Sequence, residues 1–206
     1  MDKYPKIGSS TADFPLKSAY AFNKYDGSNI RATWNKKQGF FKFGTRSRLI
    51  DKTDPDFGCA IPLVQETYGE SLGKVFTDYK RFRGVEHMTI FCEFFGPNSF
   101  AGLHKKDDPK ELMLFDVWLY KYGLMGPEDF LEHFERIKKA EVVYSGKMTG
   151  KFFDDVKQGR YNVAEGVVCK CGQGGRDLAM CKVKTNTYLE KLKKVFGESD
   201  WKNYWL

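Results

Sequence analysis

The spacing of apolar and polar residues along the chain predicts a mixture of β-strands and helices. Strands are expected where β-branched and aromatic residues alternate with polar ones or form short buried runs. Such segments are residues 28–34, 39–43, 88–95, 111–120, 163–171 and 178–185. The polar turn at 35–38 joins the first pair, and the segment 172–175, rich in glycine, joins the last pair as a hairpin. Residues 96–110 carry glycine, proline and paired charges, which predicts a loop.

Helical periodicity is less abundant. Pro127 follows Gly126 at a position that favours a helix start, and Phe130, Phe134 and Ile137 then recur at i, i+4 and i+7. A second helix is expected over residues 189–196, with Gly197 as its end. A third is expected over residues 71–83. These elements predict an α+β fold built on antiparallel β-sheets with flanking helices.

The length of 206 residues suits a single domain over residues 1–206, without repeats or an evident linker. The net charge of +7 and the pI near 9.0 favour a polyanionic partner. Aromatic residues make up 16% of the chain and supply stacking surfaces for bases, although most are expected in the core. We expect a monomer.

Five cysteines, an odd number without a secretory leader, favour a reducing compartment. Cys169 and Cys171 lack a second pair at zinc-ligand spacing. The polar N-terminus and the lack of a long apolar run predict no membrane partner. We therefore expect a cytoplasmic protein, or one in the host cytoplasm if the source is a phage.

The stretch from Lys24 to Arg31 contains several side chains that can take part in catalysis or ligand binding. A lysine amine becomes a nucleophile where nearby cations or desolvation lower its pKa. Asp26 can orient a donor or a metal-bound water, Gly27 allows close approach of a ligand to the backbone, and Arg31 can hold a phosphate. A solvated strand end is the alternative interpretation of this stretch alone.

This stretch resembles motif I (Lys-x-Asp-Gly) of the covalent nucleotidyltransferases, which include ATP-dependent polynucleotide ligases and mRNA capping guanylyltransferases. The later motifs of that superfamily have counterparts in the same order. They are Phe43–Arg48 for motif Ia, Phe91–Gly96 for motif III, Leu114–Val117 for motif IIIa, Ala164–Val168 for motif IV and Cys181–Lys184 for motif V. Each match is short, and it is their common order that makes the resemblance specific.

The resemblance implies a nucleotidyltransferase (ATP-grasp-like) adenylation domain, with the nucleotide held between two sheets. About twenty residues follow motif V, too few for the OB-fold or helical domain that most members carry. We therefore expect no OB-fold, which puts unaided ligation in question.

The resemblance also implies a role for each matching residue. Lys24 would attack the α-phosphate of ATP, with Mg²⁺ or Mn²⁺ as the divalent cation. Glu93 would hold the ribose, Phe115 would stack on the adenine, and Arg46 would contact the phosphates or the ribose. Glu165 would help place the metal, and clustered cations would help to keep the Lys24 amine unprotonated.

Lys182 and Lys184 would contact the α-phosphate, and period-two alternation in a strand places both side chains on one face. Each of these residues also has an ordinary explanation. A Lys-x-Lys pair is common on a solvated strand face, and an isolated phenylalanine such as Phe115 is typical of a core. Glu165 would then be a strand-edge carboxylate. Glu93 lies in an apolar run, where an unpaired carboxylate is costly, so we expect it to have a partner or a ligand.

Within the superfamily, the Asp-Gly-Ser-Asn form of motif I and the Thr-Arg-Ser run of motif Ia are similar to RNA ligases of the phage and repair types. We therefore expect an ATP-dependent RNA ligase. Its partner would be nucleic acid with 5′-phosphate and 3′-hydroxyl ends, RNA being favoured and DNA possible. The alternatives are a nick-sealing DNA ligase, a GTP-dependent mRNA capping guanylyltransferase and a non-catalytic nucleic-acid-binding relative.

Overall fold

The computed structural model describes residues 1–9, 11–15 and 17–205. The described residues cluster into two compact units. The first unit comprises Met1–Pro5, Gly27–Lys139 and Gln173–Arg176, and the second comprises Lys6–Asp26, Ala140–Gly172 and Asp177–Leu206. Each unit has its own antiparallel sheet. The expected single domain over residues 1–206 stays a prediction.

The sheet of the first unit has the strand order β4-β3-β2-β5-β6-β7. Neighbouring strands pair antiparallel throughout. The strands are β2 (Ser28–Asn35), β3 (Gly39–Thr45), β4 (Leu49–Ile50), β5 (Met88–Phe95), β6 (Glu111–Leu119) and β7 (Gly123–Leu124). The pattern of β-branched and aromatic residues thus predicted the central strands to within two residues.

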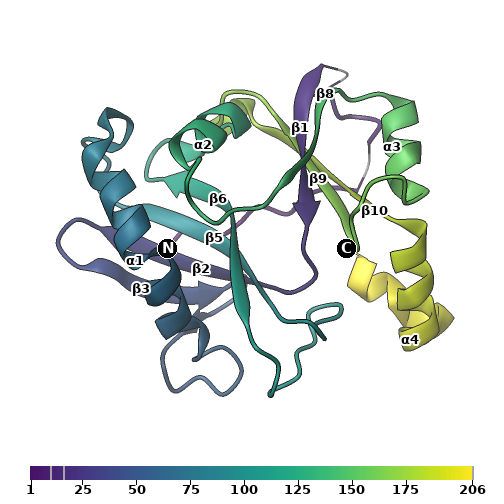
Figure 1. Ribbon diagram of the computed structural model, residues 1–206, viewed down its shortest axis with the longest axis horizontal. Coiled ribbons are helices and arrows are strands. Elements are labelled where there is room, and N and C mark those ends of the chain that lie inside the picture. The colour runs from purple at the N-terminus through teal and green to yellow at the C-terminus, as the bar shows by residue number, and fades with distance from the viewer. Residues whose placement is uncertain (10, 16, 206) are drawn as a thin grey trace. The chain divides into compact units, whose positions relative to one another are not determined.

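One face of this sheet packs against α1 (Ala60–Asp78). In Figure 1, α1 crosses over β2 and β3. Trp34 of β2 meets Phe76 of α1 with ring centroids 5.2 Å apart. The short helices η1 (Lys80–Phe82) and α2 (Pro127–His133) extend this core through contacts of Phe82 and Phe134 with Phe76.

The other face of the first sheet carries the odd-numbered residues of β2 and β5, because side chains alternate along a strand. Asn29 lies opposite Glu93, Arg31 opposite Phe91, and Thr33 opposite Thr89. This second face is therefore polar and charged, and it contains several of the predicted site residues.

The sheet of the second unit has the strand order β10-β9-β1-β8 and is also antiparallel. Its strands are β1 (Ser18–Lys24), β8 (Val142–Lys147), β9 (Gly166–Cys171) and β10 (Ala179–Lys184). Small and apolar residues of one face form a core with α3 (Gly150–Lys157), which lies beside β9 and β10 in Figure 1. Cys169, Cys171 and Cys181 belong to this core.

These observations confirm the predicted fold class: antiparallel sheets with flanking helices, and no closed barrel among the described residues. Two helix predictions need correction. The helix expected over residues 71–83 is α1, which begins at Ala60, because Ile61 and Val64 continue the buried stripe of Tyr68, Leu72 and Phe76. The helix after Pro127 ends at His133, before Ile137.

The predicted helix over residues 189–196 lies within α4 (Asn186–Trp205). Gly197 has φ 79° and interrupts the helical backbone there, so it ends one helical segment and a second follows. Strands β1 and β8 and helix α3 were not expected from the sequence. No helix in the described ranges is long and apolar enough to cross a bilayer.

Candidate functional site

Lys24, Glu165 and Lys184 form an ion-paired triad in the second unit. The Lys24 Nζ atom lies 2.7 Å from Glu165 Oε2, and the Lys184 Nζ atom lies 3.0 Å from Glu165 Oε1. Glu165 is 2% exposed, so its charge is removed from water and balanced by two amines. The structure thus brings together three residues that are far apart in the sequence.

The first strand expected from the sequence spans residues 28–34, which places Lys24 on the loop before it, and this prediction was wrong. Lys24 is the last residue of β1, where it lies opposite Gly166 of β9. Lys184 of β10 lies on the other side of the same glycine. The two lysines therefore lie on the strands at either side of β9, both opposite Gly166, which has no side chain. Asp26 follows in the bend that leads to β2.

Gly166 allows the strands to approach closely at this row. A Cβ atom at this position would lie 2.0 Å from the Val183 carbonyl oxygen and 2.8 Å from Lys184 Cα. Its φ of +154° also disfavours other residues. The glycine of the predicted motif IV thus allows the close approach of β9 to β10, the strand that carries Lys184.

Thr185 connects the triad to α4. Its backbone N–H donates to the Glu165 carbonyl oxygen at 2.9 Å, and its hydroxyl donates to the Ala164 carbonyl oxygen at 3.2 Å. The same hydroxyl accepts the Tyr188 N–H at 3.2 Å, as an N-cap does. Lys184 Nζ lies 4.9 Å from the centre of the Tyr188 ring. These contacts hold Glu165 and Lys184 in place.

Lys182 and Lys184 lie on the same face of β10, as predicted, because Cys181 and Val183 point into the core. Lys170 of β9 lies on that face too, with its Nζ atom 4.8 Å from the centre of the Phe22 ring. Lys170 was not predicted as a site residue from the sequence, in which its neighbours Cys169 and Cys171 drew attention as possible zinc ligands. Because Cys169 and Cys171 point into the core, Lys170 between them must point to the opposite face of the sheet, which also carries Lys182 and Lys184.

In the first unit, Glu93 has the partner that its apolar setting led us to expect. Its Oε1 atom accepts the Gly27 backbone N–H at 3.0 Å. Gly27 itself fits tightly, because a Cβ atom there would lie 2.2 Å from the Phe94 carbonyl oxygen. The glycine of motif I and the glutamate of motif III are thus joined directly.

Arg31 lies on the same face of the sheet and is 3% exposed. Its Nη1 atom donates to the Asp2 carbonyl oxygen at 2.8 Å, and burial lowers the pKa of its guanidinium. Gly44 makes room for it, since a Cβ atom there would lie 3.1 Å from Arg31 Nε. Contact with phosphate stays a prediction for Arg31, and its observed role is to hold the N-terminal segment.

Phe115 occupies an irregular position in β6. Asp116 pairs with Phe91 and Leu114 pairs with Cys92, so Phe115 is the extra residue of a β-bulge. A bulge redirects a side chain and frees it from ladder pairing. Phe115 is partly exposed, unlike the buried Leu114 and Asp116, so the position permits contact with a ligand.

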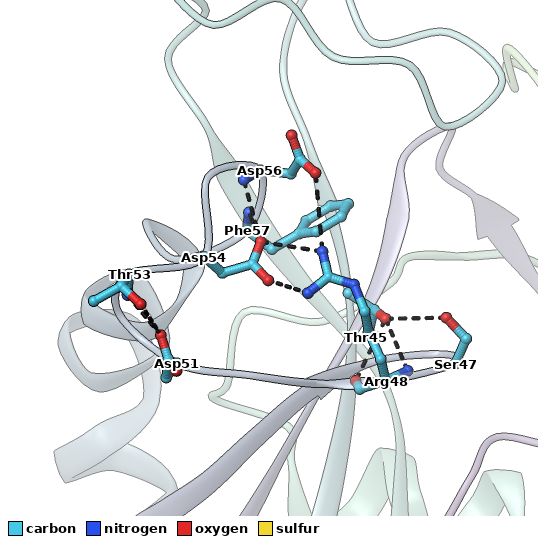
Figure 2. Close-up of polar contacts among 8 residues, drawn as sticks. All are labelled: Thr45, Ser47, Arg48, Asp51, Thr53, Asp54, Asp56 and Phe57. Carbon is cyan, nitrogen blue, oxygen red and sulfur yellow. Dashed lines mark hydrogen bonds and ion pairs between the residues drawn. The ribbon is translucent and has the colours of Figure 1, made fainter.

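Arg46 lies exposed in the turn between β3 and β4. Figure 2 shows how this turn is fixed: Thr45 Oγ1 accepts the Arg48 N–H at 3.3 Å, and the Arg48 guanidinium binds the Asp54 carboxylate. The hydrogen bond from Arg48 holds the pKa of Asp54 at about 2. Asp54 in turn accepts the backbone N–H groups of Asp56 and Phe57. Arg46 is thus displayed on an ordered turn.

A hydrogen-bond chain connects the loop 96–110 to motif I. His104 Nε2 lies 2.9 Å from Ser28 Oγ, and His104 Nδ1 lies 3.1 Å from Ser99 Oγ. Burial, and then Lys110, lower the pKa of His104, while Asp108 acts in the opposite direction. The neutral imidazole is therefore the form that the folded protein favours.

The lowered pKa of His104 predicts that the stability of the protein depends on pH. The folded protein holds the pKa of His104 below its usual 6.5, so the unfolded chain binds more protons near pH 6. The free energy of unfolding should therefore fall as the pH drops through 6.5. In urea titrations at pH 7.5 and 5.5, wild type should lose more stability than His104→Gln. Equal losses would remove His104 as the cause.

No group of three or more His, Cys, Asp or Glu side chains in the described part of the chain is arranged to hold a metal ion. Glu165 is the carboxylate that the two amines surround. Magnesium often binds through one or two carboxylates together with phosphate oxygens, so a single carboxylate fits a metal that arrives with a nucleotide.

A sequence model of the RNA ligase family matches residues 18–184. A search of curated protein sequences finds no match.

Solved structures of a Naegleria gruberi RNA ligase share the fold. A mutant with ATP and manganese is 14% identical with a TM-score of 0.67, and the match covers 93% of this chain and 58% of that one. The structure with pyrophosphate is 15% identical with a TM-score of 0.66, and covers 94% and 58%. A mutant with AMP and manganese is 15% identical, has a TM-score of 0.66 and covers 93% and 58%. This chain therefore spans less than two thirds of each.

Proposed function

Because the chain belongs to the RNA ligase family, we propose that it is an ATP-dependent RNA ligase that acts through a lysyl-AMP intermediate at Lys24. The observation that carries this proposal is the triad of Lys24, Glu165 and Lys184, with Glu165 buried between the two amines. A nucleophilic amine, a carboxylate that orients it and a second cation suit nucleotidyl transfer to lysine. The Naegleria gruberi structures contain ATP, AMP or pyrophosphate, which agrees with this chemistry.

In the first step, the Lys24 Nζ atom attacks the α-phosphorus of ATP. A nitrogen–phosphorus bond forms, the bond to the β-phosphate oxygen breaks, and pyrophosphate leaves. The amine must first lose a proton to solvent, and Glu165 Oε2, 2.7 Å from Nζ, orients the amine for attack. Lys184 then neutralises charge that develops on the α-phosphate, and Lys182 supports it from the same face of β10.

In the second step, AMP passes from Lys24 to the 5′-phosphate of an RNA end, and the lysine amine is regenerated. In the third step, a 3′-hydroxyl attacks this activated phosphate and AMP leaves. A phosphodiester bond forms and joins the strands. The net positive charge of +7 favours the polyanionic substrate of these two steps.

The nucleoside would be held by residues of the first unit, as the motif order implies. Glu93, fixed by the Gly27 N–H, would accept hydrogen bonds from the ribose, and Phe115 would stack on the adenine. Arg46 would contact phosphate or ribose from its ordered turn. Asp26 would orient groups next to Lys24.

A divalent cation, Mg²⁺ or Mn²⁺, is the proposed cofactor, and Glu165 is the residue that would hold it together with the phosphate oxygens of ATP. When bound, the cation would neutralise phosphate charge and favour departure of pyrophosphate. Both cations prefer oxygen ligands, so the carboxylate fits either.

The proposal is tested by sealing assays with three substrates: a nicked RNA duplex, single-stranded RNA and nicked DNA, all with 5′-phosphate and 3′-hydroxyl ends. We expect RNA to be joined faster than DNA, with ATP and not with GTP. Faster sealing of nicked DNA would favour a DNA ligase. Transfer of GMP to a diphosphate RNA end would favour a capping guanylyltransferase, and binding without any transfer would favour a non-catalytic relative.

A further inference from the structure

The N-terminal residues Asp2 and Tyr4 lie across the polar face of the first unit's sheet. The Asp2 carbonyl oxygen accepts a hydrogen bond from Arg31 Nη1 at 2.8 Å, and Asp2 Oδ2 accepts one from Thr89 Oγ1 at 3.2 Å. His87 Nε2 lies 3.9 Å from the same carboxylate oxygen. The buried guanidinium of Arg31 is therefore used to fix the chain two residues before Tyr4.

Tyr4 contacts two residues of the predicted motif IIIa, Phe115 and Asp116, and one of the predicted motif III, Phe91. Its ring meets the Phe115 ring edge to face, with centroids 5.0 Å apart, and lies 5.0 Å from the Phe91 ring. Its hydroxyl donates a hydrogen bond to Asp116 Oδ2. Asp116 is 1% exposed, so a donor at this position offsets part of the cost of burying the carboxylate.

These contacts matter because Phe115 lies in a β-bulge. The ladder to β5 includes Leu114 and Asp116, and its register shifts between them at Phe115. Packing against neighbouring rings therefore orients the Phe115 ring: the Phe91 ring stacks on it with centroids 6.5 Å apart, and Tyr4 makes the nearer, edge-to-face contact at 5.0 Å.

Tyr4 also interacts electrostatically with Glu93 and Arg46, which are proposed to bind the ribose and the phosphates. Burial raises the pKa of Tyr4 well above its usual value, Asp116 and Glu93 raise it further, and Arg46 lowers it. Tyr4 thus lies among the residues proposed for the base, the ribose and the phosphates.

We propose that Tyr4 is a positioning residue of the nucleotide site, which sets the orientation of the Phe115 ring for stacking on adenine. Tyr4 acts through Phe115 and does not itself contact the nucleotide. The inference rests on the proposed function, and it adds that the N-terminal segment contributes to affinity for ATP.

The test measures initial rates of AMP attachment to the protein over a range of ATP concentrations. Tyr4→Leu keeps apolar bulk but removes the aromatic edge, and we expect it to raise the KM for ATP about tenfold with little change in the maximal rate. Tyr4→Phe keeps the ring, so its KM should stay within about threefold of wild type. Tyr122→Ala is the matched control, because Tyr122 is 64% exposed.

A double-mutant cycle with Phe115→Leu separates positioning from general stability. If Tyr4 acts through Phe115, Tyr4→Leu should add little to the KM of a Phe115→Leu protein. Additive effects on KM, or an unchanged KM in Tyr4→Leu, would overturn the inference while leaving the ligase proposal intact. A wild-type protein that forms no AMP adduct would overturn the ligase proposal and this inference with it.

Discussion

Lys24→Ala is expected to lower the rate of pyrophosphate release from ATP by roughly 10⁴-fold or more, because it removes the proposed nucleophile. Lys24→Arg should be equally inactive, since a guanidinium stays protonated and cannot attack phosphorus. The arginine still supplies a charge to Glu165, so any activity lost in both variants is due to the missing amine. Lys151→Ala removes an exposed lysine of the same unit and should leave the rate unchanged.

Both variants should remain folded, although Lys24→Ala removes one of the two ion pairs of a buried carboxylate. Lys184 still pairs with Glu165, so the expected loss of stability is about 1–2 kcal/mol rather than the full cost of an unpaired buried charge. RNA that already carries AMP on its 5′-phosphate bypasses the step assigned to Lys24. Both variants should therefore seal it more readily than an ordinary 5′-phosphate end. Wild-type pyrophosphate release in Lys24→Arg would contradict the assignment.

Gly166→Ala is expected to lower the free energy of unfolding by about 3 kcal/mol or more. The new Cβ atom would lie 2.0 Å from the Val183 carbonyl oxygen, which is backbone and cannot rotate away. Strands β9 and β10 would have to separate at the row that aligns Lys24, Gly166 and Lys184. Adduct formation should therefore fall together with stability.

Urea titration followed by tryptophan fluorescence measures this effect, with Gly150→Ala as the control. Gly150 lies at the start of α3, and a Cβ atom there would meet nothing within 4 Å. Its replacement should be neutral or slightly stabilising. Wild-type stability in Gly166→Ala would show that the close approach of the strands does not depend on glycine.

Several features followed from local pattern. The run of β-branched and aromatic residues predicted β5 at residues 88–95, and alternation correctly placed Lys182 and Lys184 on one face of β10. The apolar surroundings of Glu93 correctly predicted a partner, which is the Gly27 N–H. Each of these inferences depends on neighbours in sequence or on the cost of burying a charge.

Features that depend on pairing between distant segments were missed. Residues 18–24 show a weak strand pattern, and their pairing with β8 and β9 is what makes them β1 and puts Lys24 at a strand end. The bulge at Phe115 arises from the register of β6 on β5. Likewise, the contact of Tyr4 with Asp116 joins residues 112 positions apart, which no local periodicity encodes.

Covalent attachment of AMP to Lys24 is the first step of the proposed function, and intact mass measurement detects it directly. Wild-type protein is incubated with ATP and magnesium, with GTP in a parallel sample, and each product is then heated in acid. We expect a mass increase of one AMP with ATP alone, reversed by acid and absent from Lys24→Ala. No adduct with either nucleotide from folded protein, or the same adduct in Lys24→Ala, would contradict the proposal.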